Sequence, residues 1–253
     1  MDYQPRILDN YLHTKHFLQL VNVPVFGKPF LYMKNHKAAC TTVLATLMDN
    51  LIKLRGDGAE TIDMASVHTP PKSLLLTGPR GLNMPRVMED LADRRVFKFT
   101  IVREPVARTV SAFSDKIIKG EKQKAKLMRH LKRPVDSDIS LSEFLDIMAN
   151  DEGAREVDRH WRSQRKEVSY EFIDYDFVGD MADLNGAMSH VVKTLFDVDT
   201  PELQDTRKSL GHRSASADMI AAMTAADRRN IEIAFGEDFE MYEDVRQRLA
   251  LAA

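Results

Sequence analysis

Cysteine is almost missing from this sequence: Cys40 is the single one among 253 residues. One cysteine excludes an intramolecular disulfide framework and a zinc site made of several thiolates, and it fits a reducing compartment. Long apolar runs are missing as well, because Asp2, Arg6, Asp9 and Lys15 interrupt the apolar positions of the first 25 residues. We therefore expect neither a signal peptide nor a membrane span, and we expect a soluble, cytoplasmic protein.

An excess of charge of one sign is also missing. Charged residues make up 29% of the chain, but acidic and basic residues nearly cancel to a formal net charge of −2. No global field favours a nucleic acid or an anionic membrane, and we expect neither as a partner. Any site for an anion therefore has to be built locally.

The sequence shows neither internal repeats nor a glycine-rich or proline-rich linker. Hydrophobic residues make up 43% of the chain, which is enough for a substantial core. We therefore predict a single domain over residues 1–253.

Two segments combine a short apolar run with a helical pattern. The first has the run 29–33 (PFLYM), a polar stretch, and apolar residues at helical spacing through 43–52. The second has the run 96–102 (VFKFTIV), then Pro105, which suits the first turn of a helix, and apolar residues at helical spacing through 106–117. Two such units predict neighbouring parallel strands with helical crossovers, in an α/β fold whose ligands lie at the carboxyl ends of the strands.

The rest of the chain is less regular. Residues 68–85 hold four prolines around 74–76 (LLL), which predicts loops and a short strand. Residues 119–133 contain seven Lys or Arg opposed only by Glu121, a composition that fits a solvated helix or a mobile basic flap. From residue 140 onward the pattern is mostly helical, with a predicted strand at 170–178.

The polar segment 34–42 (KNHKAACTT) joins the first strand to its helix. Its small residues allow backbone N–H groups to approach a ligand, and a helix N-terminus favours a phosphate or sulfate. The segment has a lysine and two hydroxyls, as a P-loop does, but no glycine, so ATP or GTP binding is not indicated. The residues alone also fit an ordinary strand–helix turn with solvated Lys34 and Lys37 and a cap at Thr41.

Three segments together form a distinctive set. Residues 97–116 read FKFTIVREPVARTVSAFSDK, residues 32–42 read YMKNHKAACTT, and residues 158–164 (DRHWRSQ) precede 172–184 (FIDYDFVGDMADL). The first resembles the 3′-phosphate-binding motif of the PAPS-dependent carbohydrate sulfotransferases, where PAPS is 3′-phosphoadenosine 5′-phosphosulfate. The second resembles their 5′-phosphosulfate loop, and the third resembles the downstream region of the chondroitin and related enzymes.

The chain departs from this family pattern at a few places. His36 and Ser163 stand where the family commonly has proline. The membrane anchor and the cysteines of the animal secretory members are not found, which argues against secretory glycans as substrates.

The resemblance implies a P-loop nucleotide-hydrolase-like fold of three layers, α/β/α, around a central parallel sheet. It also implies transfer of a sulfuryl group from PAPS to a hydroxyl acceptor, with a carbohydrate or glycan expected. Catalysis would consist mostly of positioning and of stabilising negative charge, so that cationic side chains suffice and no metal is implied.

The resemblance also assigns roles to residues. Lys37 would contact the sulfate and the bridging oxygen, Thr41 and Thr42 would hold the 5′-phosphate, and Arg103 and Ser111 would hold the 3′-phosphate. Taken alone, Arg103 also fits a surface ion pair with Glu104 or Asp115, and we expect Arg103, Arg108 and Ser111 to line one cleft. The other expected donor contacts come from Lys34, His36, Ala38, Ala39, Cys40, Arg108 and Arg213. His212 and Arg213 would form a nucleotide clamp, although a solvated basic turn fits them too.

The acceptor hydroxyl needs a base near neutral pH, and histidine suits that role. Two histidines are candidates. His160 belongs to the third segment and stands beside Trp161, while His68 lies upstream of the second strand, where some relatives place their catalytic histidine. Each also fits a purely structural role.

Two other functions fit parts of the sequence. A P-loop kinase or NTPase would need the Gly-Lys-Ser/Thr pattern and an acidic residue for Mg²⁺ at a strand end, and the glycines are missing. A non-catalytic anion- or glycan-binding module on the same fold would lack turnover, and the presence of Lys37 argues against it. The basic segment 119–133 fits either a solvated face or a surface that attracts an acidic acceptor such as a uronic-acid glycan.

Overall fold

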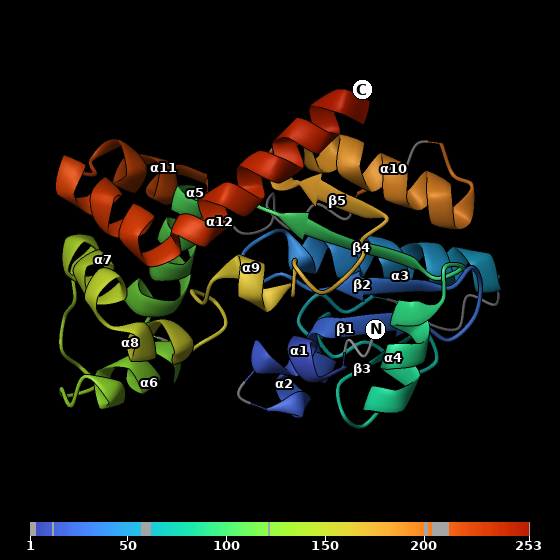
Figure 1. Cartoon of the computed structure of the whole chain (residues 1–253), viewed down its shortest axis with the longest axis horizontal. Coiled ribbons are helices and arrows are strands. Elements are labelled where there is room, and N and C mark those ends of the chain that lie inside the picture. Colours follow the sequence, from blue (N-terminus) through green and yellow to red (C-terminus); the bar gives the residue numbers. More distant parts are fainter. Residues whose placement is uncertain are drawn as a thin grey trace. The chain divides into compact units, whose positions relative to one another are not determined.

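The computed structural model describes residues 4–11, 13–56, 62–120, 122–199, 202–203 and 213–252. The chain divides into two compact units, whose helices and strands are labelled in Figure 1. The first, here called the sheet unit, comprises residues 1–35, 39–102 and 168–206; the second, the helical unit, comprises residues 36–38, 103–167 and 207–253. One domain over residues 1–253 stays a prediction.

The sheet unit is built on a five-stranded sheet with the order β3-β1-β2-β4-β5. The strands are β1 (Val21–Pro24), β2 (Phe30–Met33), β3 (Leu75–Thr77), β4 (Phe97–Val102) and β5 (Phe177–Asp180). β2 and β4 are parallel neighbours, as the sequence predicts, and β5 runs parallel to β4. The sheet is mixed, however, because β1 pairs antiparallel with both β2 and β3. The connection from β1 to β2 is too short for a crossover and therefore turns the chain back.

Helices of the sheet unit cover the sheet. They are α1 (Gln4–Asp9), α2 (Thr14–Leu20), α3 (Cys40–Arg55), α4 (Met84–Ala92) and α10 (Leu184–Phe196), with a 3₁₀ turn at Met181–Asp183. Phe30 and Tyr32 of β2 lie two residues apart and so point to one face, where they pack with Leu47 of α3 and Val191 of α10. The predicted helix after the first strand is thus confirmed as α3, and it ends at the left-handed Gly56.

Hydrogen bonds fasten β2 and β4 to each other near their carboxyl ends. The Thr100 hydroxyl donates to the Met33 carbonyl at 2.7 Å, and the Asn35 amide donates to the Ile101 carbonyl at 3.1 Å. These polar side chains are fully buried, so each bond satisfies a backbone group that would otherwise be costly to bury. The polar segment after β2 and the residues after β4 therefore start from a rigid edge.

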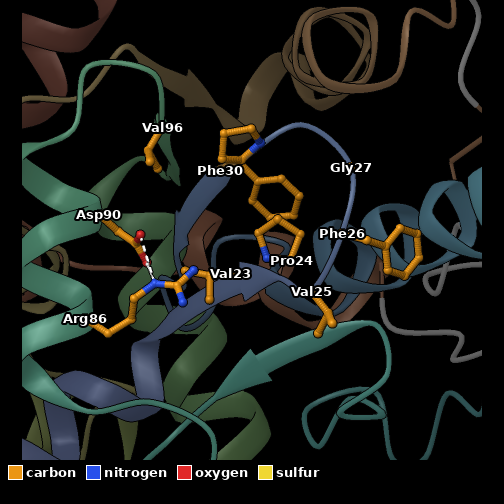
Figure 2. A pocket seen from close by; sticks show the side chains of 10 residues that line it. Val23, Pro24, Val25, Phe26, Gly27, Phe30, Arg86, Asp90 and Val96 are labelled. Atoms are coloured by element: carbon orange, nitrogen blue, oxygen red, sulfur yellow. Dashed lines mark hydrogen bonds and ion pairs between the residues drawn. The ribbon is translucent and has the colours of Figure 1, made fainter.

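A pocket of about 210 Å³ opens elsewhere in the sheet unit (Figure 2). The connection from β1 to β2 lines it together with α4, on which Arg86 and Asp90 form an ion pair at 3.1 Å. None of the site residues predicted from the sequence lines this pocket.

The helical unit contains α5 (Pro105–Ala112), a π-helix at Phe113–Ile118, α6 (Lys122–His130), α7 (Leu141–Asn150), α8 (Glu152–Glu156), α9 (Gln164–Glu167), α11 (Arg213–Ala221) and α12 (Ala225–Ala252). Its core includes Phe113, Phe144 and Trp161. Phe144 meets Trp161 edge to face at 5.8 Å, and the Trp161 indole N–H donates to the Ala154 carbonyl at 3.0 Å. The predicted helix at Pro105 and the predominantly helical remainder are confirmed.

Two further expectations have clear outcomes. The basic segment 119–133 contains the helix α6, which buries Leu127 and Met128, so the helical alternative holds. The predicted strand at 170–178 is largely wrong: residues 170–176 form turns and the strand starts at Phe177. The Tyr175 hydroxyl donates to the Val168 carbonyl at 2.5 Å, a bond that a straight strand does not allow.

No helix in the described ranges is at once long and apolar enough for a membrane span.

Candidate active site

The predicted site residues fall in both units. The helical unit contains His36, Lys37, Ala38, Arg103, Arg108, Ser111 and His160. The sheet unit contains Lys34, Ala39, Cys40, Thr41, Thr42 and His68. Arg213 begins α11, but its side chain, like the whole of His212, lies outside the described residues.

The polar segment after β2 forms a turn without glycine. Lys37 (φ 66°) and Ala39 (φ 57°) both adopt the left-handed conformation, which costs a non-glycine residue of order 1–3 kcal/mol. Ala39 stands at the N-cap of α3, where no side chain caps the helix. Strain of this kind is found most often at ligand-binding sites. The left-handed residues explain how the loop turns sharply although glycine is missing.

Two arginines of the helical unit hold the backbone of this loop. The Arg108 Nε donates to the carbonyl of His36 at 3.0 Å, and the Arg103 Nη1 donates to the carbonyl of Lys37 at 3.0 Å. In a trans peptide the N–H points opposite to the C=O. The N–H groups of Lys37 and Ala38 therefore point away from the guanidinium groups, as an amide cradle for an anion requires.

Arg103 is itself held in place. It directly follows β4, and the side-chain amide of Gln164 accepts from its backbone N–H at 3.2 Å and donates to its carbonyl at 2.7 Å. Burial, helped by the nearby charge of Arg108 and opposed by Glu104, lowers the pKa of Arg103 to about 10. The guanidinium is therefore still charged at neutral pH.

Arg108 is almost fully buried, with 1% of its surface exposed. Besides the loop carbonyl it reaches the carbonyl of Arg162 through Nη1 at 2.7 Å. Arg108 thus links the loop to the segment 158–164. Ser111 lies one turn later on α5 and is half-buried.

The Lys37 ammonium lies 2.9 Å from a carboxylate oxygen of Asp115 in the π-helix. The same carboxylate pairs with Lys119 at 2.8 Å and with Lys116 at 3.1 Å. Burial alone would raise the pKa of Asp115, but hydrogen bonds from Lys119 and Lys37 lower it far below its ordinary value. Three ammonium groups thus contact the same carboxylate.

Two histidines of the helical unit are each joined to a carboxylate. His160 Nδ1 lies 2.5 Å from Asp158, and His36 Nδ1 lies 2.6 Å from Glu167. The two rings meet edge to face at 4.8 Å. Burial lowers the pKa of His160, the bond to Asp158 opposes this, and the charges of Lys116 and Lys37 lower it further.

The second candidate base has a different setting. His68 belongs to the sheet unit, is exposed, and has its Nε2 at 3.1 Å from the hydroxyl of Thr41. Thr42, the other loop hydroxyl, is buried at the start of α3.

Sequence reasoning missed four side chains that shape this site. They are Asp115, Asp158, Gln164 and Glu167. Asp158 stands two residues before His160, a spacing that the sequence displays, and Asp115 is visible within the string 97–116. Nothing local marks Glu167, which contacts a residue 131 positions away. Among the described residues, no group of three or more potential His, Cys, Asp or Glu ligands is arranged for a metal ion.

Comparisons with curated proteins and with solved structures give no match. A family model described as the sulfotransferase family matches residues 27–243. This range includes the loop 34–42, the string 97–116 and the segment 158–184, which supply most of the residues described above. Since the match covers most of the sequence, the chain belongs to the sulfotransferase family, whose members transfer sulfuryl groups to acceptors.

Proposed function

We propose that this chain transfers a sulfuryl group from PAPS to a hydroxyl of a carbohydrate acceptor, on a P-loop nucleotide-hydrolase-like fold of three layers. The observation that carries the proposal is the pair of bonds from Arg103 and Arg108 to consecutive carbonyls of the loop that bears Lys37. These bonds join the segment that resembles a 5′-phosphosulfate loop to the one that resembles a 3′-phosphate motif. Such a junction is what a donor with phosphates at both positions needs.

The charges of the helical unit fit this donor. The ammonium groups of Lys37, Lys116 and Lys119 all contact Asp115, so three cationic groups lie close together where a polyanion would bind. Lys37 would move its compact charge to the sulfate and the bridging oxygen. Arg103 and Ser111 would bind the 3′-phosphate, while the loop amides and the hydroxyls of Thr41 and Thr42 would bind the 5′-phosphate. These cationic and hydroxyl groups suffice for the transfer without a metal ion.

His160 is the base that we assign to the acceptor hydroxyl. Its ring contacts the ring of His36 at 4.8 Å, and His36 directly precedes Lys37, the residue that would contact the sulfate. Its side chain keeps 17% of its surface exposed, which leaves access for a substrate. His68 is the alternative base, because it lies beside a loop hydroxyl.

The exposed face of α6 supports an anionic carbohydrate as the acceptor. Lys122, Lys126 and Arg129 follow one another at helical spacing and are exposed. Lys126 also pairs with Asp158, the partner of His160. A sugar that carries carboxylate or sulfate groups would match this face, in a reducing, cytoplasmic setting that suits the single cysteine.

Calorimetric titration with 3′-phosphoadenosine 5′-phosphate, the product of the reaction, tests the donor site. We expect binding that Arg103→Ala weakens by about 10- to 100-fold, the value of charge-assisted hydrogen bonds to phosphate. Arg95→Ala is the matched control, because it removes an arginine that is 87% exposed and pairs only at the surface. Equal affinity of both variants, or a preference for ATP with Mg²⁺, would contradict the proposal.

Turnover needs a separate measurement. Transfer of radiolabelled sulfate from PAPS to a panel of neutral and acidic oligosaccharides should label the acidic ones more strongly. Binding of the nucleotide product without any transfer would instead support a non-catalytic binding module on this fold.

A further inference from the structure

We infer that Asp158 is a positioning residue that fixes the tautomer and the orientation of His160, and that Lys126 holds Asp158 in place. The inference rests on the proposed function, since it concerns the base of that reaction. It assigns a role in turnover to an aspartate and a lysine to which the proposed function gives no contact with the donor.

Asp158 holds the histidine at two points. Its Oδ1 lies 2.5 Å from His160 Nδ1 and accepts the backbone N–H of His160 at 3.2 Å. A carboxylate acceptor at Nδ1 keeps the proton on that nitrogen, which leaves the lone pair on Nε2. That is the tautomer which can take a proton from a substrate hydroxyl. The same contact fixes the ring so that Nε2 points away from Asp158.

Lys126 completes the arrangement from α6. Its ammonium lies 2.8 Å from Asp158 Oδ2, so the two carboxylate oxygens have different partners and the carboxylate cannot rotate without breaking one contact. The Asp158 side chain is only 4% exposed, whereas that of Lys126 is 46% exposed. Burial raises the pKa of Asp158, but hydrogen bonds from His160 and Lys126 outweigh burial and lower it far below its ordinary value. Asp158 therefore stays ionised and stabilises the imidazolium form of His160.

The neighbouring pair of His36 and Glu167 has the same type of contact as His160 and Asp158, a histidine Nδ1 beside a carboxylate. Glu167 is 2% exposed and also lies 3.9 Å from Arg162, while His36 has its carbonyl bonded to Arg108. His36 is thereby tied to the protein at both its ring and its backbone. The charged and titratable groups that act on or contact His160 are Asp158, Lys37, Lys116 and the ring of His36.

In the transfer step, a bond forms between the acceptor oxygen and sulfur while the bond from sulfur to the bridging oxygen breaks. The bonding pair leaves with the 5′-phosphate of the nucleotide product. The hydroxyl proton goes to Nε2 of His160, and the charge that this creates is balanced by Asp158 without a second proton transfer. Asp158 thus acts only through His160.

Asp158→Asn is the test, because the amide has the size of the carboxylate but no charge. It allows the other tautomer of His160, so kcat should fall by about 10²- to 10⁴-fold. The affinity for 3′-phosphoadenosine 5′-phosphate should stay within about threefold of wild type, since the proposed function assigns Asp158 no contact with the nucleotide. The double variant with His160→Asn should lose little more than either single variant, because the two residues act as a unit.

The pH profile separates positioning from a merely structural role. The contact with Asp158 raises the pKa of His160 against the effect of burial. Its removal should therefore move the acid limb of kcat/KM to lower pH in Asp158→Asn. Lys126→Met should lower kcat by about tenfold or less, because Asp158 keeps its contact with the histidine.

The inference is overturned if Asp158→Asn has the kcat of the wild type and the same acid limb in its pH profile of kcat/KM. It is also overturned if His68→Asn abolishes turnover while His160→Asn does not, or if Asp158→Asn loses nucleotide binding and fold together with activity. A wild-type protein that neither binds the nucleotide product nor transfers sulfate would refute the proposed function itself, which is a different result.

Discussion

The two units bury different kinds of polar groups. In the sheet unit most buried polar side chains are uncharged: Asn22, Asn35, Thr42, Thr46, Asn50, Thr100 and Ser169. In the helical unit many are charged: Arg108, Asp158, Arg162, Glu167, Asp227 and Asp238. Buried charges contribute little net stability, because desolvation offsets their attraction. The difference agrees with our proposal that charged groups of the helical unit take part in the reaction.

Among the changes that compare the two units, loss of the Lys37 charge should have the largest effect. Lys37→Ala removes the group assigned to the leaving oxygen, so kcat should fall by about 10²- to 10³-fold, the usual cost of losing one group that stabilises developing charge. Lys53→Ala is the control from the sheet unit, because it removes an ammonium that is 58% exposed on α3. Initial rates under saturating PAPS measure both. A comparable loss in the control would erase the contrast between the units.

Core substitutions sharpen the comparison further. Leu47→Ala in the sheet unit deletes a fully buried side chain and should lower the free energy of unfolding by about 2–5 kcal/mol. Nucleotide affinity should be unchanged wherever the variant is folded. Denaturant titration and calorimetry give the two quantities.

Asp238→Asn is the counterpart in the helical unit. The Asp238 carboxylate accepts from the Ser163 hydroxyl and from the N–H groups of Gln164 and Arg165 at 2.7–2.9 Å. An amide has one oxygen for these donors, so the cost in unfolding free energy should be about 1–3 kcal/mol. Nucleotide binding should weaken as well, because Gln164 holds the backbone of Arg103. If Leu47→Ala weakened nucleotide binding and Asp238→Asn did not, our interpretation of the two units would be wrong.

The smallest expected effect is a shift in the pH dependence of kcat/KM. His160 must be neutral to accept a proton, and burial together with Lys116 and Lys37 lowers its pKa from 6.5. Activity should therefore persist as the pH falls through 6.5 and decline only at lower pH, where the ring becomes protonated. A profile of kcat/KM against pH measures this. An acid limb above 6.5 would mean that another group acts as the base.

Much of the fold follows from local patterns. The strands at 30–33 and 97–102 and the helices that follow them are marked by their apolar spacing, and Pro105 marks the start of a helix. The strand predicted at 170–178 fails because contacts outside that window, such as the bond from Tyr175 to Val168, bend the chain there. Local hydrophobicity does not report such contacts.

Only part of the candidate site can be predicted from the sequence. Lys37, Arg103 and His160 can be proposed as site residues because the family resemblance covers their positions. The partners that hold them are harder to see, because a bond such as that from Gln164 to Arg103 joins residues 61 positions apart. The left-handed conformation of Lys37 is likewise unmarked, since glycine is the usual signal for it.

The bonds from Arg103 and Arg108 to the loop carbonyls limit which segments can be exchanged between members of this family. A loop whose shape is set by two residues far along the sequence cannot be transplanted alone. A chimera that exchanges 34–42 but not 103–108 would pair a foreign backbone with these arginines and leave buried donors unmatched. The smallest exchangeable part of this enzyme is therefore the two segments together.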